Sequence, residues 1–342
     1  MSTTDRGIDA DLRSVVVEGV LDKLRTHYIF PETAQAIVHT VRQRLHSGAY
    51  DGITTAITLR DALTAHLQEL SHDRHLVLRY SPEPQPLSER VNLLDDPTVL
   101  EQMRRSALVD NFGFERVERL LGNIGYIGLR YFSPAEWAGE TAAAAMTLLA
   151  HTAALILDLR QNGGGAGSMV DLLCSYLLPA TAERPIHLYD FSAPSEDRLE
   201  QHWTLPHVAS ARYLDRPVYL LTSQHTISAP ELFAYTLQAL QRAVVVGETT
   251  TGAANRIGKY QINGHFSVLI PIGHTTSAVT GTNWEGTGVI PDYDVPAEEA
   301  LKAAHAVALR RVLASIGNSP TGPHVGLLEE VQTALAELER AS

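Results

Sequence analysis

Short apolar runs alternate with helical patterns through the middle of the chain. Each run has the length of a buried strand, and each longer stretch between two runs repeats its apolar residues with the spacing of a helix. This alternation predicts right-handed βαβ units, in which helices cover a sheet of parallel strands. The predicted strands are residues 126–132, 155–159, 218–221 and 244–246, and the predicted helices are residues 141–150, 168–178 and 229–240. The predicted fold class is therefore α/β.

Residues 10–71 instead predict three amphipathic helices. In the first of them, apolar residues recur every three or four positions, which places them on one face. Pro31 suits the first turn of the second helix, and Thr58 suits the N-cap of the third. Helices joined by such short links favour a small bundle. Further helices are predicted over residues 97–121 and 327–338, a strand over residues 75–80, and a hairpin over residues 260–272 that turns at Asn263-Gly264.

The composition excludes several classes of function. The 342 residues are 44% hydrophobic, which suffices for one large domain or two. The net charge of −12 argues against nucleic acids and anionic membranes as the main partners. No apolar run is long enough to span a membrane, and the first residues carry no secretory signal, so we expect a cytoplasmic protein. Zinc-ligand spacings, phosphate loops and dinucleotide motifs are absent, so we expect no metal and no cofactor. The composition leaves homo-oligomerisation open.

Ser228 lies between a predicted buried strand and a predicted helix. At such a junction a hydroxyl is exposed, and the N–H groups of the first helical turn point toward developing negative charge. Ser228 is therefore a candidate nucleophile. The alternative is a structural N-cap, with Glu231 three residues later completing a capping box.

A glycine-rich turn follows the predicted strand that ends at residue 159. Gly163, Gly164 and Gly165 have no side chains, so the backbone there can aim N–H groups at a reacting oxygen. The alternative is a turn that only connects a strand closely to a helix. At the end of the strand, Asp158 and Arg160 predict an ion pair inside the fold.

Four short motifs occur in order along the chain. Residues 158–165 read Asp-Leu-Arg-Gln-Asn-Gly-Gly-Gly, and residues 222–231 read Thr-Ser-Gln-His-Thr-Ile-Ser-Ala-Pro-Glu. Residues 247–252 read Gly-Glu-Thr-Thr-Thr-Gly, and residues 283–286 open the last motif with Asn-Trp-Glu-Gly. Together they resemble a superfamily that comprises the tail-specific (C-terminal processing) serine peptidases, the tricorn protease core and the interphotoreceptor retinoid-binding protein modules. The Asn-Trp-Glu-Gly string is most similar to the retinoid-binding-protein-like branch.

The resemblance implies a crotonase-like (ClpP-like) core, a spiral of ββα units, beside an N-terminal helical bundle. Tail-specific peptidases usually carry a peptide-binding PDZ module between these parts. The segment that separates His75 from the next predicted core strand is too short for it, so we expect no PDZ module. The expected domains are residues 1–82 (three helices and the first strand), 83–121 (a linker and helical connection), 122–316 (the catalytic core) and 317–342 (a C-terminal helix).

The resemblance implies that Ser228 is the nucleophile of an acyl-enzyme mechanism. Tail-specific peptidases use a lysine as the base, but Ala253 occupies that position here, and Lys259 lies further on in the predicted hairpin. Tricorn-like enzymes use a histidine, which implies His75 as the general base and Glu285 as the carboxylate that orients it. Two other interpretations stay open: His75 as a structural histidine at the start of a strand, and Glu285 as a surface carboxylate.

The remaining site residues also follow from the resemblance. His72 is a second candidate base, and together with His225 and Asn255 it is expected to line the substrate site. The N–H groups of Gly163 and Gly164, with that of Ala229, are implied as the oxyanion hole.

Three functions are consistent with these residues. The first is a serine hydrolase, a peptidase that acts on short peptides through an acyl-enzyme. The second is a non-hydrolytic binding protein for a lipophilic small molecule such as a retinoid or a fatty acid, because one fold can serve both purposes. The third is a relative recruited to small-molecule biosynthesis. Whether Ser228 reacts with an active-site serine probe separates the first from the second.

Overall fold

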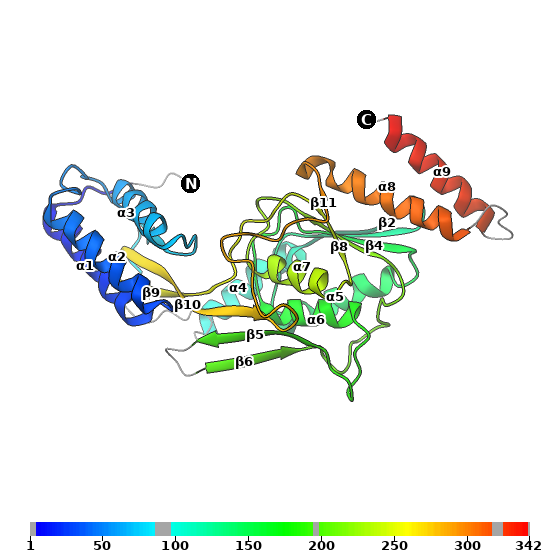
Figure 1. Ribbon diagram of the computed structural model, residues 1–342, viewed down its shortest axis with the longest axis horizontal. Helices are drawn as coiled ribbons and strands as arrows, with labels where there is room; N and C mark the ends of the chain where they lie inside the picture. The colour runs from blue at the N-terminus through cyan, green and yellow to red at the C-terminus, as the bar shows by residue number, and fades with distance from the viewer. Residues whose placement is uncertain (1–4, 86–96, 194–197, 317–323, 341–342) are drawn as a thin grey trace. The chain divides into compact units, whose positions relative to one another are not determined.

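The computed structural model describes residues 5–85, 97–193, 198–316 and 324–340 (Figure 1). The chain divides into two compact units. Unit 1 comprises residues 1–100, 191–200 and 255–275, and unit 2 comprises residues 101–190, 201–254 and 276–342. The domain boundaries expected after residues 82, 121 and 316 stay predictions. No helix within the described ranges is long and apolar enough to cross a membrane.

Unit 1 packs three helices against one face of a sheet. The helical prediction is confirmed by α1 (Ala10–His27), α2 (Pro31–His46) and α3 (Ala56–Ser71). The predicted hairpin is also present, as β9 (Arg256–Gln261) and β10 (Phe266–Ser277), and β1 (Val77–Tyr80) pairs with the other edge of β10. The apolar stripe of α1 is buried against residues of this sheet.

The third helix begins earlier than predicted. Thr55, and not Thr58, is its N-cap, because the Thr55 backbone is extended and its side chain accepts a hydrogen bond from the N–H of Thr58. Pro31 does begin α2. A threonine inside the first turn resembles a cap in sequence, since both positions favour the same short polar side chains.

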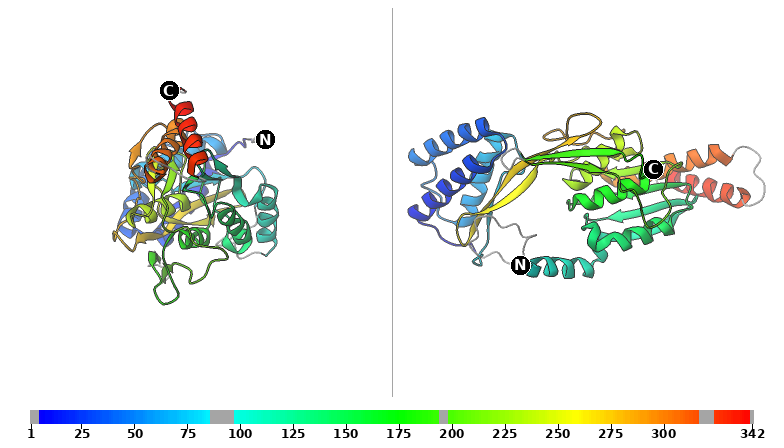
Figure 2. Two further views of the ribbon diagram at one scale, coloured as in Figure 1. Left: turned by 90° about the vertical axis from the view of Figure 1, so that its right-hand side faces the viewer. Right: turned by 90° about the horizontal axis from the view of Figure 1, so that it is seen from below.

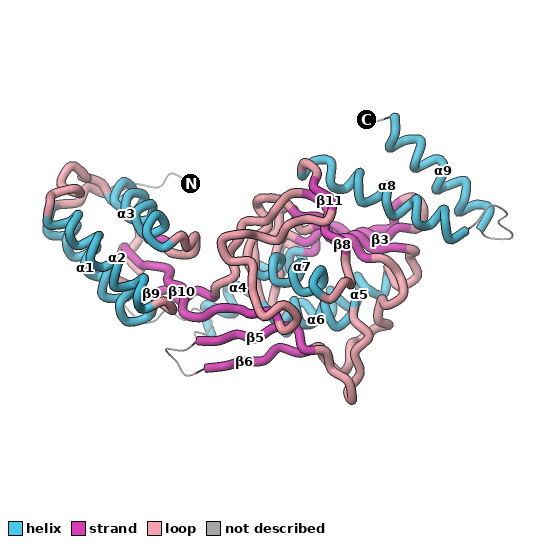
Figure 3. Tube along the Cα trace, viewed as in Figure 1, coloured by secondary structure: helices cyan, strands magenta, loops and turns pink. Residues whose placement is uncertain are grey.

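Unit 2 is built on a six-stranded sheet whose strands are parallel except at one edge. Its order is β11-β8-β7-β4-β3-β2, and only β2 runs antiparallel to its neighbour. The element order therefore confirms the predicted βαβ alternation, and Figure 3 shows these helices in cyan and strands in magenta. The strands are β2 (Phe114–Leu120), β3 (Ile124–Leu129), β4 (Ala154–Asp158), β7 (Val218–Thr222), β8 (Val244–Gly247) and β11 (Tyr293–Asp294).

Helices cover both faces of this sheet because alternate strand residues point to opposite sides. Leu155 and Leu157 of β4 share a core with α5 (Ala135–Leu148), α6 (Gly167–Leu177) and α7 (Ala229–Ala239). Ile156, between them, belongs to a second core with α8 (Ala297–Ile316) and α9 (His324–Arg340). These last two helices form the orange and red pair in Figure 2.

Two segments differ from the sequence prediction. The helix predicted over residues 97–121 ends at Val109, in α4 (Pro97–Val109), and a short 3₁₀ turn, η1 (Asn111–Gly113), leads into β2. Gly122 and Asn123 both have positive φ, which is the geometry of a tight hairpin turn between β2 and β3. The hairpin of β5 (His187–Ala193) and β6 (Arg198–Trp203) was not predicted at all, and it extends the sheet of β10.

Candidate active site

Three loops meet at the carboxyl ends of β4, β7 and β8 in unit 2. They are residues 159–166, 223–228 and 248–254. The N–H of Ile227 donates to the carbonyl of Asn162 at 3.3 Å, and the N–H of Thr251 donates to the carbonyl of Thr226 at 3.1 Å. Ligands of parallel α/β sheets bind at this end of the strands. The sequence motifs of the three loops therefore converge in one place.

Ser228 has a backbone conformation that is rare for a residue with a side chain. Its φ is 72° and its ψ is −118°, and α7 begins at the next residue. Such a conformation costs roughly 1–3 kcal/mol and persists only where the surroundings hold it. A side-chain carbon at Gly164 would lie 3.4 Å from the Cβ of Ser228 and 3.8 Å from its Oγ, so the glycine turn lies directly beside the serine.

The carboxylate of Glu231 holds this conformation. It is fully buried, and its Oε2 accepts hydrogen bonds from the N–H groups of Ser228 at 2.7 Å and Ala253 at 3.1 Å. Its Oε1 accepts from the Thr250 hydroxyl at 2.6 Å and the Gly252 N–H at 2.7 Å. Burial raises the pKa of Glu231, although these four donors act in the opposite direction. Glu231 is thus more than the capping residue that the sequence indicated, because it joins two of the three loops.

The glycine turn already uses two of the N–H groups assigned to the oxyanion hole. The N–H of Gly163 donates to the carbonyl of Arg130, and the N–H of Gly164 donates to Oδ1 of Asn162, both at 3.1 Å. In this conformation neither is available to a substrate oxygen. Among the described residues we find no acceptor for the N–H of Ala229 or of Gly165. Gly165 is a donor that sequence reasoning did not select.

Gly165 can be no other residue. Its φ is +138°, and a side-chain carbon there would lie 2.1 Å from the carbonyl oxygen of Phe132. The two residues form a parallel bridge that uses the carbonyl of Gly164 and the N–H of Ala166. In such a bridge the N–H of the middle residue points away from the paired strand. The same turn therefore connects the strand closely to the helix and also leaves the N–H of Gly165 free to point away from Phe132.

Glu285 lies on the loop that follows β10 and contacts the third loop. Its Oε2 accepts a hydrogen bond from the N–H of Ala254 at 2.7 Å, and its own N–H donates to Oδ1 of Asn283 at 3.1 Å. Trp284 beside it is buried. Ala253, at the position of the family lysine, is also buried, and it contributes only its N–H to the site.

The two candidate base histidines belong to unit 1. His75 follows α3, is largely buried, and its Nδ1 lies 3.9 Å from Oδ1 of Asp73. Asp73 also accepts hydrogen bonds from the His75 N–H at 2.9 Å and from the Tyr28 hydroxyl at 3.1 Å. Burial lowers the pKa of His75, and the Asp73 carboxylate partly opposes this. His72 is exposed and ends α3 in a left-handed conformation.

The remaining predicted site residues divide between the units. His225 lies in unit 2, in the loop that ends at Ser228, whereas Asn255 and Lys259 lie in unit 1. Lys259 is on β9, where it pairs with Leu269 of β10. Unit 2 therefore brings together Ser228, Gly163, Gly164, Ala229, His225 and Glu285, and unit 1 holds His72, His75 and Asn255.

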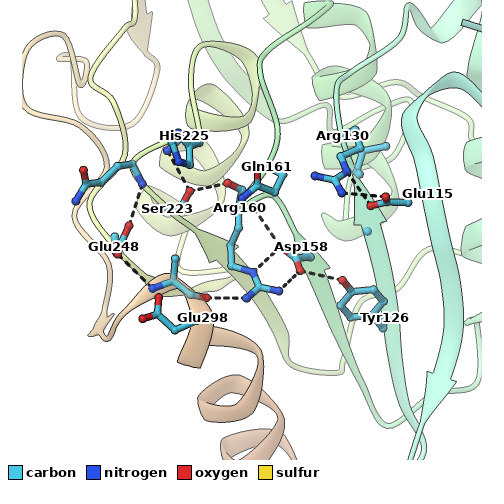
Figure 4. A pocket seen from close by; sticks show the side chains of 14 residues that line it. Glu115, Tyr126, Arg130, Asp158, Arg160, Gln161, Ser223, His225, Glu248 and Glu298 are labelled. Carbon is cyan, nitrogen blue, oxygen red and sulfur yellow. Dashed lines mark hydrogen bonds and ion pairs between the residues drawn. The ribbon is translucent and has the colours of Figure 1, made fainter. Parts of the chain in front are cut away.

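A pocket of about 640 Å³ opens at the ends of β4 and β7 (Figure 4). The predicted ion pair is present in its wall, since Arg160 contacts Asp158 at 2.5 Å and also donates to the carbonyl of Ala297 at 2.6 Å. The Tyr126 hydroxyl donates to Asp158, and burial raises the pKa of this tyrosine. His225 lines the pocket and Ser228 does not. Arg160 therefore joins the end of β4 to the first residue of α8.

Comparison with known proteins agrees with these motifs. Residues 123–295 match the family model of peptidase family S41, and residues 11–111 match the N-terminal domain of peptidase S41 in eukaryotic interphotoreceptor retinoid-binding protein. The chain belongs to peptidase family S41. The family assignment covers both the central sheet of unit 2 and the helices of unit 1.

Three solved structures match this chain, and the two with TM-scores above 0.5 are similar in fold. A putative peptidase from Parabacteroides merdae is 19% identical, with 91% of this chain and 99% of that chain covered and a TM-score of 0.59. The tricorn protease is 13% identical, with coverages of 96% and 37% and a TM-score of 0.53. The photosystem II D1 C-terminal processing protease is 22% identical, with coverages of 51% and 43% and a TM-score of 0.42. The chain thus spans less than half the length of the last two proteins.

The sequence analysis gave Asp73 no role, and it treated Glu231 only as a capping residue. Asp73 carries the buried carboxylate nearest to His75 in unit 1, and Glu231 carries the carboxylate that holds Ser228. The first precedes the histidine by two positions in an Asp-x-His string, which was the available signal. Glu231 contacts the loop after β8 through tertiary hydrogen bonds, so no local sequence pattern predicts these contacts.

Proposed function

We propose that the chain is a serine peptidase that cleaves short peptides through an acyl-enzyme on Ser228. Family membership supports a serine peptidase, and the backbone of Ser228 is the observation that carries the assignment. A strained serine at a strand-to-helix junction, held by a buried carboxylate and flanked by glycine, is suited to present its hydroxyl to a substrate.

In the proposed reaction, Oγ of Ser228 attacks the scissile carbonyl while His75 accepts its proton. His75 then gives this proton to the leaving amine. In the second half of the reaction, His75 accepts a proton from water, the oxygen of this water attacks the acyl carbonyl, and the proton passes to Oγ of Ser228 as it leaves. A buried histidine with a lowered pKa is neutral at neutral pH, as a general base must be. We assign the orientation of its ring to Glu285, with Asp73 as the alternative carboxylate.

The N–H of Ala229 is the first donor of the proposed oxyanion hole. It begins α7, so it carries the partial positive charge of a helix N-terminus. Gly165 is the second donor that the hydrogen-bond pattern favours. Gly163 and Gly164 can contribute only after the bonds to Arg130 and Asn162 open.

The alternative function is non-hydrolytic binding, and two observations favour it. Ala253 removes the family lysine, and two of the three expected oxyanion donors are already used. The large pocket of unit 2 argues against a retinoid or fatty acid, because charged and polar side chains dominate its lining. Recruitment to small-molecule biosynthesis stays open beside it. We also propose a crotonase-like core without a PDZ module.

Labelling with a fluorophosphonate tests the proposed function. The reagent modifies a serine only where a base and an oxyanion hole activate it, so the adduct is expected on Ser228 of the folded chain. The Ser228→Ala variant is the control and should take up no label. A folded parent chain that remains unlabelled would favour the binding function.

A further inference from the structure

Unit 1 carries a polar hollow on the sheet face opposite its helices. The strand register places Arg79 of β1 and Gln261 of β9 on either side of Ser267 of β10. Lys259 lies two residues along β9, opposite Leu269. The alternate residues of these strands are buried against the helices, so this set points the other way. The hollow has a volume of about 370 Å³.

Two cations line this hollow without a partner among the described residues. Arg79 is exposed and Lys259 is half-buried, and neither side chain makes an ion pair or a hydrogen bond within the described part of the chain. No acidic side chain is present among the described residues that line it. In a chain with a net charge of −12, a hollow whose described charged side chains, Arg79 and Lys259, are both cationic favours an anionic ligand.

The hollow also contains an acceptor that lacks a donor. Gln261 is only 7% exposed, its Nε2 donates to the carbonyl of Asn263 at 2.7 Å, and its Oε1 has no partner among the described residues. Buried amide oxygens are nearly always hydrogen-bonded, so this one suits a ligand N–H. Leu269, half-buried beside Lys259, offers an apolar contact.

We propose that this hollow binds the C-terminal residue of a peptide. Its carboxylate would lie between Arg79 and Lys259, its N–H would reach the Gln261 amide after a small side-chain rotation, and its side chain would contact Leu269. A free phosphate has neither an N–H nor an apolar group. That the ligand is a peptide rests on the proposed function, whereas the unpaired charges do not. An aspartate or glutamate side chain within a peptide offers the same carboxylate, and the experiment separates the two sources.

Fluorescence anisotropy with the full-length Ser228→Ala chain measures binding without turnover. Three N-terminally labelled alanine-rich pentapeptides are compared: one ending in leucine with a free carboxylate, the same peptide amidated, and an amidated peptide with one internal glutamate. Amidation should weaken binding at least about tenfold, or about 1.4 kcal/mol. Arg79→Gln and Lys259→Gln should each weaken binding of the free acid about tenfold. Lys23→Gln, on α1 and away from the hollow, is the matched control and should change Kd less than about twofold.

The outcomes divide clearly. Loss of affinity on amidation together with sensitivity to both substitutions supports a C-terminal carboxylate. Equal binding of the glutamate peptide with the same sensitivity supports the carboxylate site but changes its source to a side chain. Equal binding of all three peptides, no binding, or unchanged affinity in both variants overturns the proposal. An unlabelled Ser228 in the parent chain would refute the peptidase and leave this binding result standing.

Discussion

Replacing Glu231 with glutamine tests whether one buried carboxylate holds the catalytic loops. Glutamine has nearly the same shape, but one of its oxygens becomes an NH₂ group that cannot accept a hydrogen bond. The amide fits best with its nitrogen toward Thr250, because a hydroxyl can rotate and accept. The oxygen then keeps the N–H groups of Ser228 and Ala253, and the N–H of Gly252 loses its acceptor.

The expected loss of stability follows from the number of N–H groups that lose their acceptor. One buried N–H without an acceptor costs roughly 1–3 kcal/mol, and the retained bonds lose their charge assistance. Burial raises the pKa of Glu231, so a neutral group recovers part of this cost. We expect the free energy of unfolding of unit 2 to fall by about 2 kcal/mol in Glu231→Gln. Glu231→Ala leaves three N–H groups without acceptors and should cost at least about 3 kcal/mol.

Tryptophan fluorescence during urea unfolding measures this change. All three tryptophans, Trp137, Trp203 and Trp284, belong to unit 2, so the signal follows the unfolding of this unit. The midpoint should fall while the slope stays constant. Glu140→Gln, an exposed carboxylate on α5, is the matched control and should shift the free energy by less than about 0.5 kcal/mol. If Glu231→Gln unfolds like this control, the carboxylate does not hold the loops.

Three further predictions concern the serine, the histidine and the glycine turn. Ser228→Ala should keep its unfolding midpoint while peptide turnover falls by several orders of magnitude; turnover at the parent rate would remove Ser228 from the mechanism. Because burial lowers the pKa of His75 and the base must be neutral, the acid limb of kcat/KM should lie below about 6.5, and His75→Gln should abolish activity; a limb well above that value contradicts the assignment. Gly165→Ala should cost at least about 2 kcal/mol in urea unfolding, because its Cβ would lie 2.1 Å from a backbone oxygen. Gly139→Ala, inside α5, where the added Cβ would make only an ordinary contact with Leu172 at 3.8 Å, should instead stabilise by about 0.5–1 kcal/mol, and equal effects would refute the steric argument.

The elements of the sheet that were predicted are those that are buried on both faces. β4 and β7 are continuous apolar runs with helices on either side, so their sequences show both their length and their burial. β2 is an edge strand whose sequence contains Arg116, Glu118 and Arg119, and charged residues on both of its faces hide the alternation of a strand. No residue of β6 is buried, so this strand lacks the burial on which the prediction depends.

The contacts of the site also divide into those that a local pattern predicts and those that depend on tertiary packing. Ser228 and Glu231 are three residues apart, so a local pattern could predict that the carboxylate reaches the serine N–H, and the structure has this bond. The occupied N–H of Gly163 depends on Arg130, which lies 33 residues earlier on another loop. Such a contact is set by the packing of β3 against β4, and no spacing within the glycine motif encodes it. The local motif therefore predicted which residues approach Ser228 but not which donors stay available.

The alanine at position 253 and the burial of His75 support the same choice of base. Three N–H groups and one hydroxyl donate hydrogen bonds to the Glu231 carboxylate, so its charge is stabilised without a cation. Ala253, at the position of the family lysine, supplies no amine that could act as a base. The base proposed for Ser228 therefore lies outside the three loops of this site. His75 has the property this requires, because its burial disfavours the imidazolium and so keeps the ring able to accept a proton at neutral pH. Asp73 beside it partly opposes this effect of burial on the pKa of His75.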